Sequence, residues 1–193
     1  SGMDTLFRNY AVWREIRSFA QQWLHSDSLL SSHIVNMWLE FDTEKPVFQE
    51  DMTGFIARPS VFLGFRSAGL TAGELRGLLE QSATLLRLSK ETIESIVSFV
   101  GGIPSPGQLF QLGSMLGRPT RDIRLCINRL GYDMIPGWLS DMGWQGNGKA
   151  LTGILGVLAP IVRTFAIDLN LSETGISEKI GIECYMDWDE KDP

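Results

Sequence analysis

Apolar residues near the start of the chain recur at steps of three and four, which is the pattern of an amphipathic helix. The stripe consists of Leu6, Tyr10, Trp13, Ile16, Ala20 and Trp23. It predicts a helix over residues 4–25, and residues 26–32 then break the pattern. Residues 34–42 alternate apolar with other side chains, which predicts a strand, and a second strand is predicted over residues 60–65.

Capping and turn residues divide the rest of the chain into further elements. Thr71 and Glu74 stand at capping-box spacing ahead of a leucine-rich stretch, which predicts a helix to about residue 88. Ser89 predicts the start of a second helix, which ends at the glycines and prolines between residues 101 and 107. Two more helices are predicted over residues 135–142 and 149–164, the latter kinked by Pro160, and four more strands over residues 108–116, 121–128, 165–171 and 179–188.

The predicted order is a helix and two strands, followed twice by two helices and two strands. It indicates one α/β (α+β) domain over residues 1–193, with an antiparallel sheet or partial barrel in which strand pairs alternate with helix pairs and helices cover one face. Residues 1–3 are interpreted as a tag scar and the start, residues 4–25 as the N-terminal helix, and residues 34–188 as the repeated core.

Alternate residues of a strand point to opposite faces of a sheet, so each side chain of a predicted strand is assigned to a face. One face is apolar and should lie under the helices, with Met37, Leu39, Phe41, Ile123, Leu125, Ile127, Phe165, Ile167, Leu169, Ile180, Ile182 and Met186. The other face is polar and acidic, with Trp38, Glu40, Asp42, Asp122, Arg124, Cys126, Asp168, Asn170, Glu183, Tyr185 and Asp187. Three interpretations of the polar face stay open: a sheet wetted by solvent, a barrel lumen that holds a ligand, and a face buried by a partner subunit.

The order of helices and strand pairs over residues 34–188, with a polar inner face, resembles the aromatic prenyltransferases of the ABBA barrel type. That resemblance implies an antiparallel barrel, ringed by helices, that holds an isoprenoid diphosphate and an aromatic acceptor. Only six strands are readable, and Arg124 is the one clear cation of the inner face. A diphosphate needs several positive side chains, so transfer from a diphosphate is not expected.

Three short segments resemble uncharacterised bacterial proteins encoded near peptide natural-product genes: residues 38–42 (WLEFD), 59–62 (PSVF) and 179–184 (KIGIEC). This resemblance implies a bacterial accessory or tailoring protein of natural-product biosynthesis, and it transfers no catalytic residue. We expect such a protein to bind a small molecule or peptide on the polar sheet face. The alternative is a non-catalytic module for protein–protein binding or assembly, which docks a partner on that face or on the stripe of the first helix, and a homo-oligomer is possible.

Paired carboxylates are the candidates for chemistry. If the protein is an enzyme, Glu40 and Glu183 would serve as general acid and base, because like charges held close raise the pKa of one carboxyl. The predicted ligand-binding residues are Trp38, Asp42, Arg124, Asp168 and Tyr185. Carboxylates can also bind Mg²⁺ or Ca²⁺, although no other cofactor is expected. Acidic residues at alternate positions are equally typical of a solvated sheet face.

Two other motifs favour ordinary structural roles. Residues 143–150 (GWQGNGKA) match most of a phosphate-binding loop, but Ala150 lacks the hydroxyl that holds Mg²⁺. A glycine-rich turn that caps the next helix is predicted there instead. His25 and His33 have no cysteine or carboxylate beside them at metal-ligand spacing, so we interpret them as surface or capping residues and predict no metal site.

Composition and charge narrow the range of partners. The net charge of −6, with no run of Lys or Arg, argues against binding to nucleic acid or to an anionic membrane surface. The longest apolar stretch is short and interrupted, and no leader-like segment follows Met3, so a cytoplasmic protein without a membrane segment is expected. Cys126 and Cys184 are predicted to be buried thiols within strands in a reducing compartment.

Overall fold

A computed structural model of the 193-residue chain describes residues 8–41, 59–66, 70–116, 118, 120–172 and 174–186. Asp42, Asp187, Trp188 and most of the loop predicted over residues 43–59 lie outside the described residues. The strands are β1 (Ile34–Glu40), β2 (Ser60–Phe65), β3 (Gln108–Ser114), β4 (Ile123–Leu130), β5 (Thr164–Ser172) and β6 (Gly175–Tyr185). The helices are α2 (Ala11–Trp23), α3 (Leu29–His33), α5 (Ala72–Leu86), α6 (Lys90–Gly101), α7 (Ile135–Asp141) and α8 (Gly148–Leu158).

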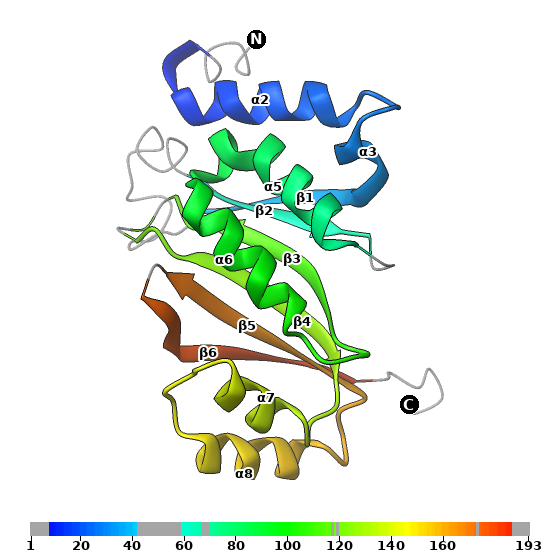
Figure 1. The fold of residues 1–193 in the computed structure, drawn as a ribbon, viewed down its shortest axis with the longest axis vertical. Coiled ribbons are helices and arrows are strands. Elements are labelled where there is room, and N and C mark those ends of the chain that lie inside the picture. Colours follow the sequence, from blue (N-terminus) through cyan, green and yellow to red (C-terminus); the bar gives the residue numbers. More distant parts are fainter. Residues whose placement is uncertain are drawn as a thin grey trace, which may run out of the picture.

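The strands form one open antiparallel sheet in which β1 to β6 are neighbours in the order of the chain (Figure 1). Two helices precede each pair of strands, so the predicted α+β fold with alternating helix and strand pairs is confirmed. β1 and β6 are the edges of the sheet and, within the described residues, do not pair with each other. The sheet is therefore open, and the closed barrel considered as one interpretation of the polar face is not formed.

Several element boundaries differ from the predictions, and three of the differences have a clear local cause. The short helix α3 forms where the apolar pattern breaks, because the Ser28 side chain accepts a hydrogen bond from the Ser31 backbone N–H at 3.0 Å and caps it. α8 ends at Leu158 and is not kinked, because Pro160 has no backbone N–H to continue the helix. β6 begins at Gly175, whose φ of +112° suits the tight turn from β5 and favours glycine.

The strand register confirms the predicted division of side chains between two faces. Leu125 on β4 lies opposite Leu112 on β3 and Leu169 on β5. All three are buried in the core under the helices. Arg124 lies opposite Gly113 and Asn170 on the other face. Two predicted assignments fail at strand ends: Asp122 precedes β4, and Met186 follows β6 with 52% of its surface exposed.

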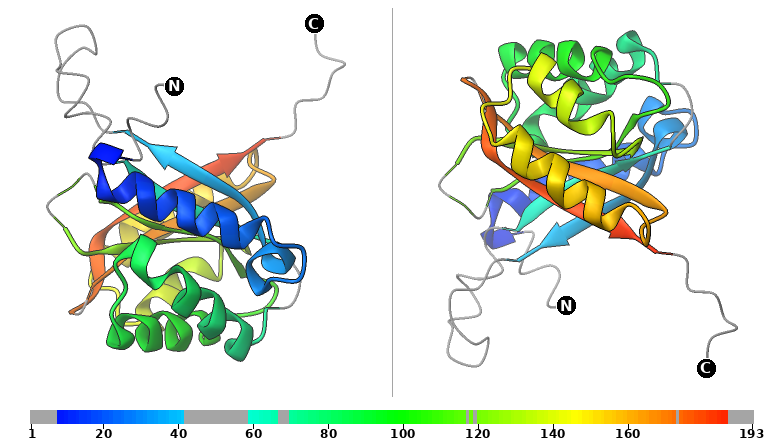
Figure 2. Two further views of the ribbon diagram at one scale, coloured as in Figure 1. Left: turned by 90° about the horizontal axis from the view of Figure 1, so that it is seen from above. Right: turned by 90° about the horizontal axis from the view of Figure 1, so that it is seen from below.

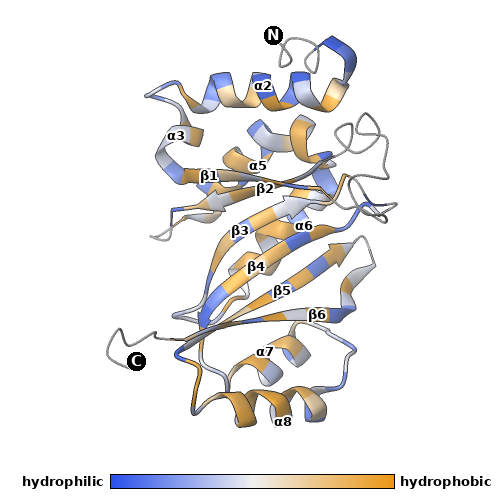
Figure 3. Cartoon of the chain, turned by 180° about the vertical axis from the view of Figure 1, so that it is seen from behind, coloured by the Kyte–Doolittle hydropathy of each residue, from blue (hydrophilic) through white to orange (hydrophobic). Residues whose placement is uncertain are grey.

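The helices lie along the sheet in the order of the chain, from α2 near β1 to α8 near β6 (Figures 1 and 2). The stripe of α2 is buried in the same core as the strands, through Val12, Trp13, Ile16 and Phe19. Figure 3 shows the opposite face of the sheet, with α5 and α6 behind the strands. Among the described residues, no helix combines the length and the apolar character that crossing a bilayer requires.

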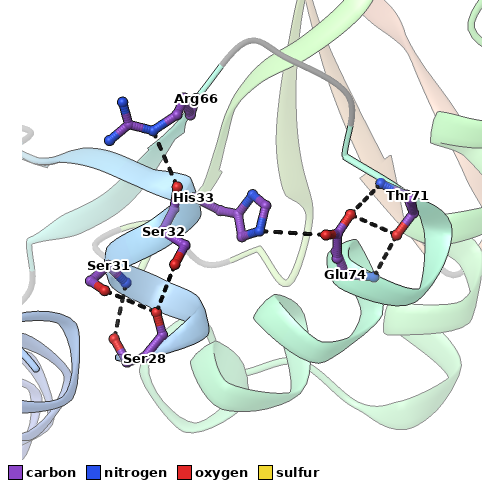
Figure 4. Close-up of polar contacts among 7 residues, drawn as sticks. All are labelled: Ser28, Ser31, Ser32, His33, Arg66, Thr71 and Glu74. Carbon is purple, nitrogen blue, oxygen red and sulfur yellow. Dashed lines mark hydrogen bonds and ion pairs between the residues drawn. The ribbon is translucent and has the colours of Figure 1, made fainter. Parts of the chain in front are cut away.

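The junction between α3, β1 and α5 fixes the first strand pair against the helices (Figure 4). Thr71 and Glu74 form the predicted capping box at the start of α5. Glu74 also places Oε1 3.7 Å from Nε2 of His33, the last residue of α3. Arg66, just after β2, donates from Nε to the Ser32 carbonyl at 3.1 Å. His33, predicted as a surface or capping residue, is thus a part-buried residue at the end of α3 beside an exposed carboxylate.

Candidate functional site

The helix-free face of the sheet contains a hollow of about 590 Å³, which we call the sheet hollow. Every strand contributes to its lining. The lining residues are Val35, Asn36, Trp38, Leu39, Glu40, Phe62, Gly64, Phe65, Phe110, Gln111, Arg124, Cys126, Asp168, Glu183 and Tyr185. Because the edge strands β1 and β6 line the same space, the sheet must curl toward this face, as its twist allows.

The sheet hollow brings together most of the predicted site residues. Trp38 and Glu40 enter from β1, Arg124 from β4, Asp168 from β5, and Glu183 and Tyr185 from β6. Asp42 lies outside the described residues. Asp122, assigned by parity to the same face, lines a separate pocket beside the start of α6. The prediction from strand parity therefore identified one shared surface, although which of these residues bind or react stays a prediction.

Three glycines lie against side chains of the hollow or its rim, and sequence reasoning missed them. A Cβ on Gly113 would lie 2.0 Å from Cδ1 of Phe62, so the phenyl ring lies directly over this glycine. A Cβ on Gly64 would lie 2.2 Å from Oδ1 of Asn36, and one on Gly181 would lie 3.0 Å from Cβ of Asp168. Each glycine sits in a strand opposite the larger residue. A glycine inside a strand pattern is the signal that marks such close approaches.

The acidic end of the hollow lies on β4, β5 and β6. The Tyr185 hydroxyl donates to Oε2 of Glu183 at 2.5 Å, and this bond raises the pKa of Tyr185 to about 12 because it holds the phenol proton. Arg124 donates from Nε to Oδ1 of Asn170 at 3.1 Å. Burial, and then the charge of Asp168, raise the pKa of the Cys126 thiol. These surroundings favour the neutral form of the Cys126 thiol, which is a weaker nucleophile than the thiolate.

Asp168 is the most unusual group of the hollow. Its Oδ1 atom is shielded from solvent and has no hydrogen-bond partner in the described part of the chain. Burial raises the pKa of this carboxyl, a hydrogen bond with the Cys126 thiol opposes that shift, and the nearby charge of Glu183 raises the pKa further. A buried acceptor without a donor costs free energy in the folded protein. Because Asp168 also lines the hollow, this carboxyl is a candidate contact for an external donor.

Asparagine at position 168 is expected to stabilise the fold at neutral pH. The folded-state pKa of Asp168 lies above its unfolded value. The stability that this carboxyl contributes is therefore complete below about pH 3.9, and it is lost as the pH rises through the folded pKa. The neutral amide of Asp168→Asn avoids that loss. Thermal unfolding followed by circular dichroism should give a higher Tm than the parent at pH 7, and the gain should vanish at pH 3.

Asp141→Asn supplies the matched control for this change, because Asp141 is an exposed residue at the end of α7. It removes the same charge without affecting a buried carboxyl, and its Tm should follow that of the parent at both pH values. A lower Tm for Asp168→Asn at pH 7 would show that the carboxylate is well solvated or well paired in the folded state.

Glu40 and Glu183, the predicted acid and base, have separate partners. Glu40 forms an ion pair with Arg118, whose NH2 lies 2.9 Å from Oε1, while Glu183 accepts from Tyr185. The two carboxylates stand on opposite edge strands, five strand spacings apart, or roughly 24 Å along a flat sheet. Curling shortens that path. Glu183 acts on its neighbours at the acidic end, where it raises the pKa of Asp168 and of Tyr185. The acid–base roles stay a prediction.

Aromatic side chains stand at both edges of the hollow. Trp38 on β1 is 61% exposed and Tyr185 on β6 is 48% exposed. Trp38 lies opposite Phe62 in the register of β1 and β2. Trp138 and Trp144, in contrast, are buried in the core. Large exposed rings beside a hollow are typical of binding surfaces.

The remaining motifs have structural roles, with one correction. Residues 143–147 form the turn before α8, and the Asn147 side chain accepts from the Ala150 N–H at 2.9 Å to cap the helix. Among the described residues, no group of three or more His, Cys, Asp or Glu side chains has the arrangement of a metal site. Cys126 is buried as predicted, but Cys184 is exposed because it sits near the end of an edge strand.

No protein-family model, curated protein or solved structure matches this chain. The resemblance to ABBA-type prenyltransferases and the resemblance to bacterial proteins near peptide natural-product genes therefore gain no support from known proteins. Both stay predictions, and function has to be inferred from the geometry of the sheet hollow.

Proposed function

We infer that this chain binds a small molecule or peptide in the sheet hollow. The observation that carries the proposal is the hollow itself, because its volume of about 590 Å³ falls in the range of about 300–1,000 Å³ typical of ligand sites. Its lining combines aromatic rings with a few polar groups, which is the composition of such sites. The role as a bacterial accessory or tailoring protein is part of the same proposal and rests on the segment resemblance alone.

Binding fits the arrangement of the carboxylates better than acid–base chemistry does. Glu40 is bonded to Arg118 and Glu183 to Tyr185, so each predicted acid or base already has a partner in the folded protein. A general acid and base have to reach the same reacting group within hydrogen-bond distance. Asp168, in contrast, lines the hollow and has one buried oxygen without a hydrogen-bond donor among the described residues.

A protein–protein module is the second candidate, and one surface favours it. α8 carries Ile154 and Val157 on its outer side, with 50% and 77% of their surfaces exposed, and Ile161 follows the helix at 64%. The stripe of α2, considered as a docking surface, lies in the core instead. Size-exclusion chromatography with light scattering distinguishes this candidate from ligand binding in the hollow, because a docking module should form a stable oligomer or complex.

A fragment screen followed by amide chemical shifts tests binding in the hollow. Gln111→Trp should abolish binding, because Gln111 lies on the floor between Gly64 and Cys126 and an indole there fills the space. Ile154→Trp adds the same bulk on the exposed side of α8 and should leave binding unchanged. If no fragment shifts the amides around the hollow in the parent protein, or if Gln111→Trp binds as the parent does, the proposal is wrong.

A further inference from the structure

The proposed binding site can be assigned a class of ligand. Resting on that proposed function, we propose that the sheet hollow takes a small organic cation, with its positive group beside Asp168 and Glu183 and its apolar body over Phe62. Charge, hydrogen-bonding capacity and the spacing of the lining residues lead to this assignment.

The charge of the lining favours a cation. Four charged side chains line the hollow: the carboxylates of Glu40, Asp168 and Glu183, and the guanidinium of Arg124. Glu40 is neutralised by Arg118 from the loop after β3. Asp168 and Glu183 then lie close enough to influence each other, with Arg124 as the nearby positive charge. The acidic end therefore carries an excess of negative charge that a ligand cation would complement.

The hydrogen-bonding capacity of this end is also one-sided. Oδ1 of Asp168 has no donor among the described residues, although the Cys126 thiol bonds to the same carboxyl, and Oε2 of Glu183 accepts one bond from Tyr185. An ionised carboxylate can only accept, with about four lone-pair positions, so both groups have room for further donors. An ammonium group has three donors and no acceptor, and it supplies what these atoms lack. An anion would find one guanidinium here, with its Nε already bonded to Asn170.

The apolar surface lies within reach of the acidic end. The ring of Phe62 covers Gly113 on β3, and Asp168 stands on β5, two strands away. Two strand spacings of about 4.8 Å give roughly 10 Å, which is the length of a small amphipathic molecule. Trp38, beside Phe62, is exposed on the same side. An apolar surface at that distance from the carboxylates favours an organic cation, whose apolar body can lie on it. A bare metal ion would instead need several oxygen ligands at once.

Three probes of similar shape test the assignment: phenylbutylamine, phenylbutanol and phenylbutyrate, which are cationic, neutral and anionic at neutral pH. Titration followed by amide shifts gives the affinity and the location of each. The amine should bind in the hollow at least about tenfold more tightly than the alcohol, with the acid weakest, as expected for a charge-assisted hydrogen bond. Asp168→Asn should lower the affinity for the amine about tenfold and leave the affinity for the alcohol unchanged. Unchanged binding of the alcohol also shows that the hollow is intact in this variant.

Asp141→Asn is the control and should bind all three probes as the parent does. Equal or tighter binding of the alcohol or the acid in the hollow would overturn the cation assignment and leave the proposed binding function standing. Amine binding that Asp168→Asn does not weaken would overturn it as well. If none of the three probes shifts the hollow, the cation assignment fails, and the fragment screen then decides whether the binding function fails with it.

Discussion

Replacing Trp138 by alanine is expected to lower the free energy of unfolding by about 4 kcal/mol. The indole lies in the core on α7 and joins this helix to α6. Its Nε1 donates to the Gly102 carbonyl at 3.0 Å, and its ring packs edge-on against Phe99 with centroids 5.8 Å apart. Alanine removes the buried surface, the ring contact and the donor together. Urea unfolding at equilibrium measures the change.

Two further variants separate the contributions of Trp138. Trp138→Phe keeps much of the packing but leaves the Gly102 carbonyl without its donor, so we expect a loss of about 1–2 kcal/mol. Tyr132→Ala, at a 47% exposed ring in the turn before α7, should change stability by less than about 0.5 kcal/mol. A loss below about 1 kcal/mol in Trp138→Ala would mean that α7 does not pack on α6 through this residue.

Alanine in place of Gly113 should lower the free energy of unfolding by about 2 kcal/mol. The added Cβ would meet three atoms of the Phe62 ring at 2.0 to 2.6 Å, so the ring has to leave its position. Gly113 lies on β3, inside the sheet, where the backbone cannot easily shift. The displaced ring enters the sheet hollow, so binding of any ligand there should weaken as well.

A double-mutant cycle identifies Phe62 as the cause. In the Phe62→Ala background the ring is absent, so the further change Gly113→Ala should cost less than about 0.5 kcal/mol. Gly156→Ala on the exposed side of α8 is the matched control, because a Cβ there meets no atom within 4 Å. It should stabilise the protein by up to about 1 kcal/mol, since alanine favours a helix interior. Additive costs in the cycle would exclude the ring as the source of strain.

Local patterns predicted most of the fold. β2 forms over the predicted residues 60–65, and the capping box of Thr71 and Glu74 starts α5. These features depend on side-chain period and on bonds between residues three apart, which a sequence displays directly. The parity of the strands also placed Arg124, Asp168 and Glu183 on one surface. The assignment of a side chain to a face relies on regular alternation along its strand, because a shift of one residue moves every side chain to the other face.

Features that depend on distant partners could not be predicted in this way. Glu40 meets Arg118 from a loop 78 residues away, so its pairing follows from the fold and not from its neighbours in sequence. The open sheet depends on twist accumulated over six strands. The role of Gly113 depends on a ring from the adjacent strand β2. Cys184 is exposed because β6 is an edge, which the alternation within one strand does not reveal.

The matching order of strands in the sheet and in the chain has a consequence for how the molecule can assemble. Each strand bonds only to the strand before it and the strand after it. Each pairing therefore closes only the stretch of chain between two consecutive strands, and the entropy lost in that step does not grow with the length of the protein. During synthesis on the ribosome, each block of two helices and two strands can pair with the edge of the sheet already formed, before the last residues are made.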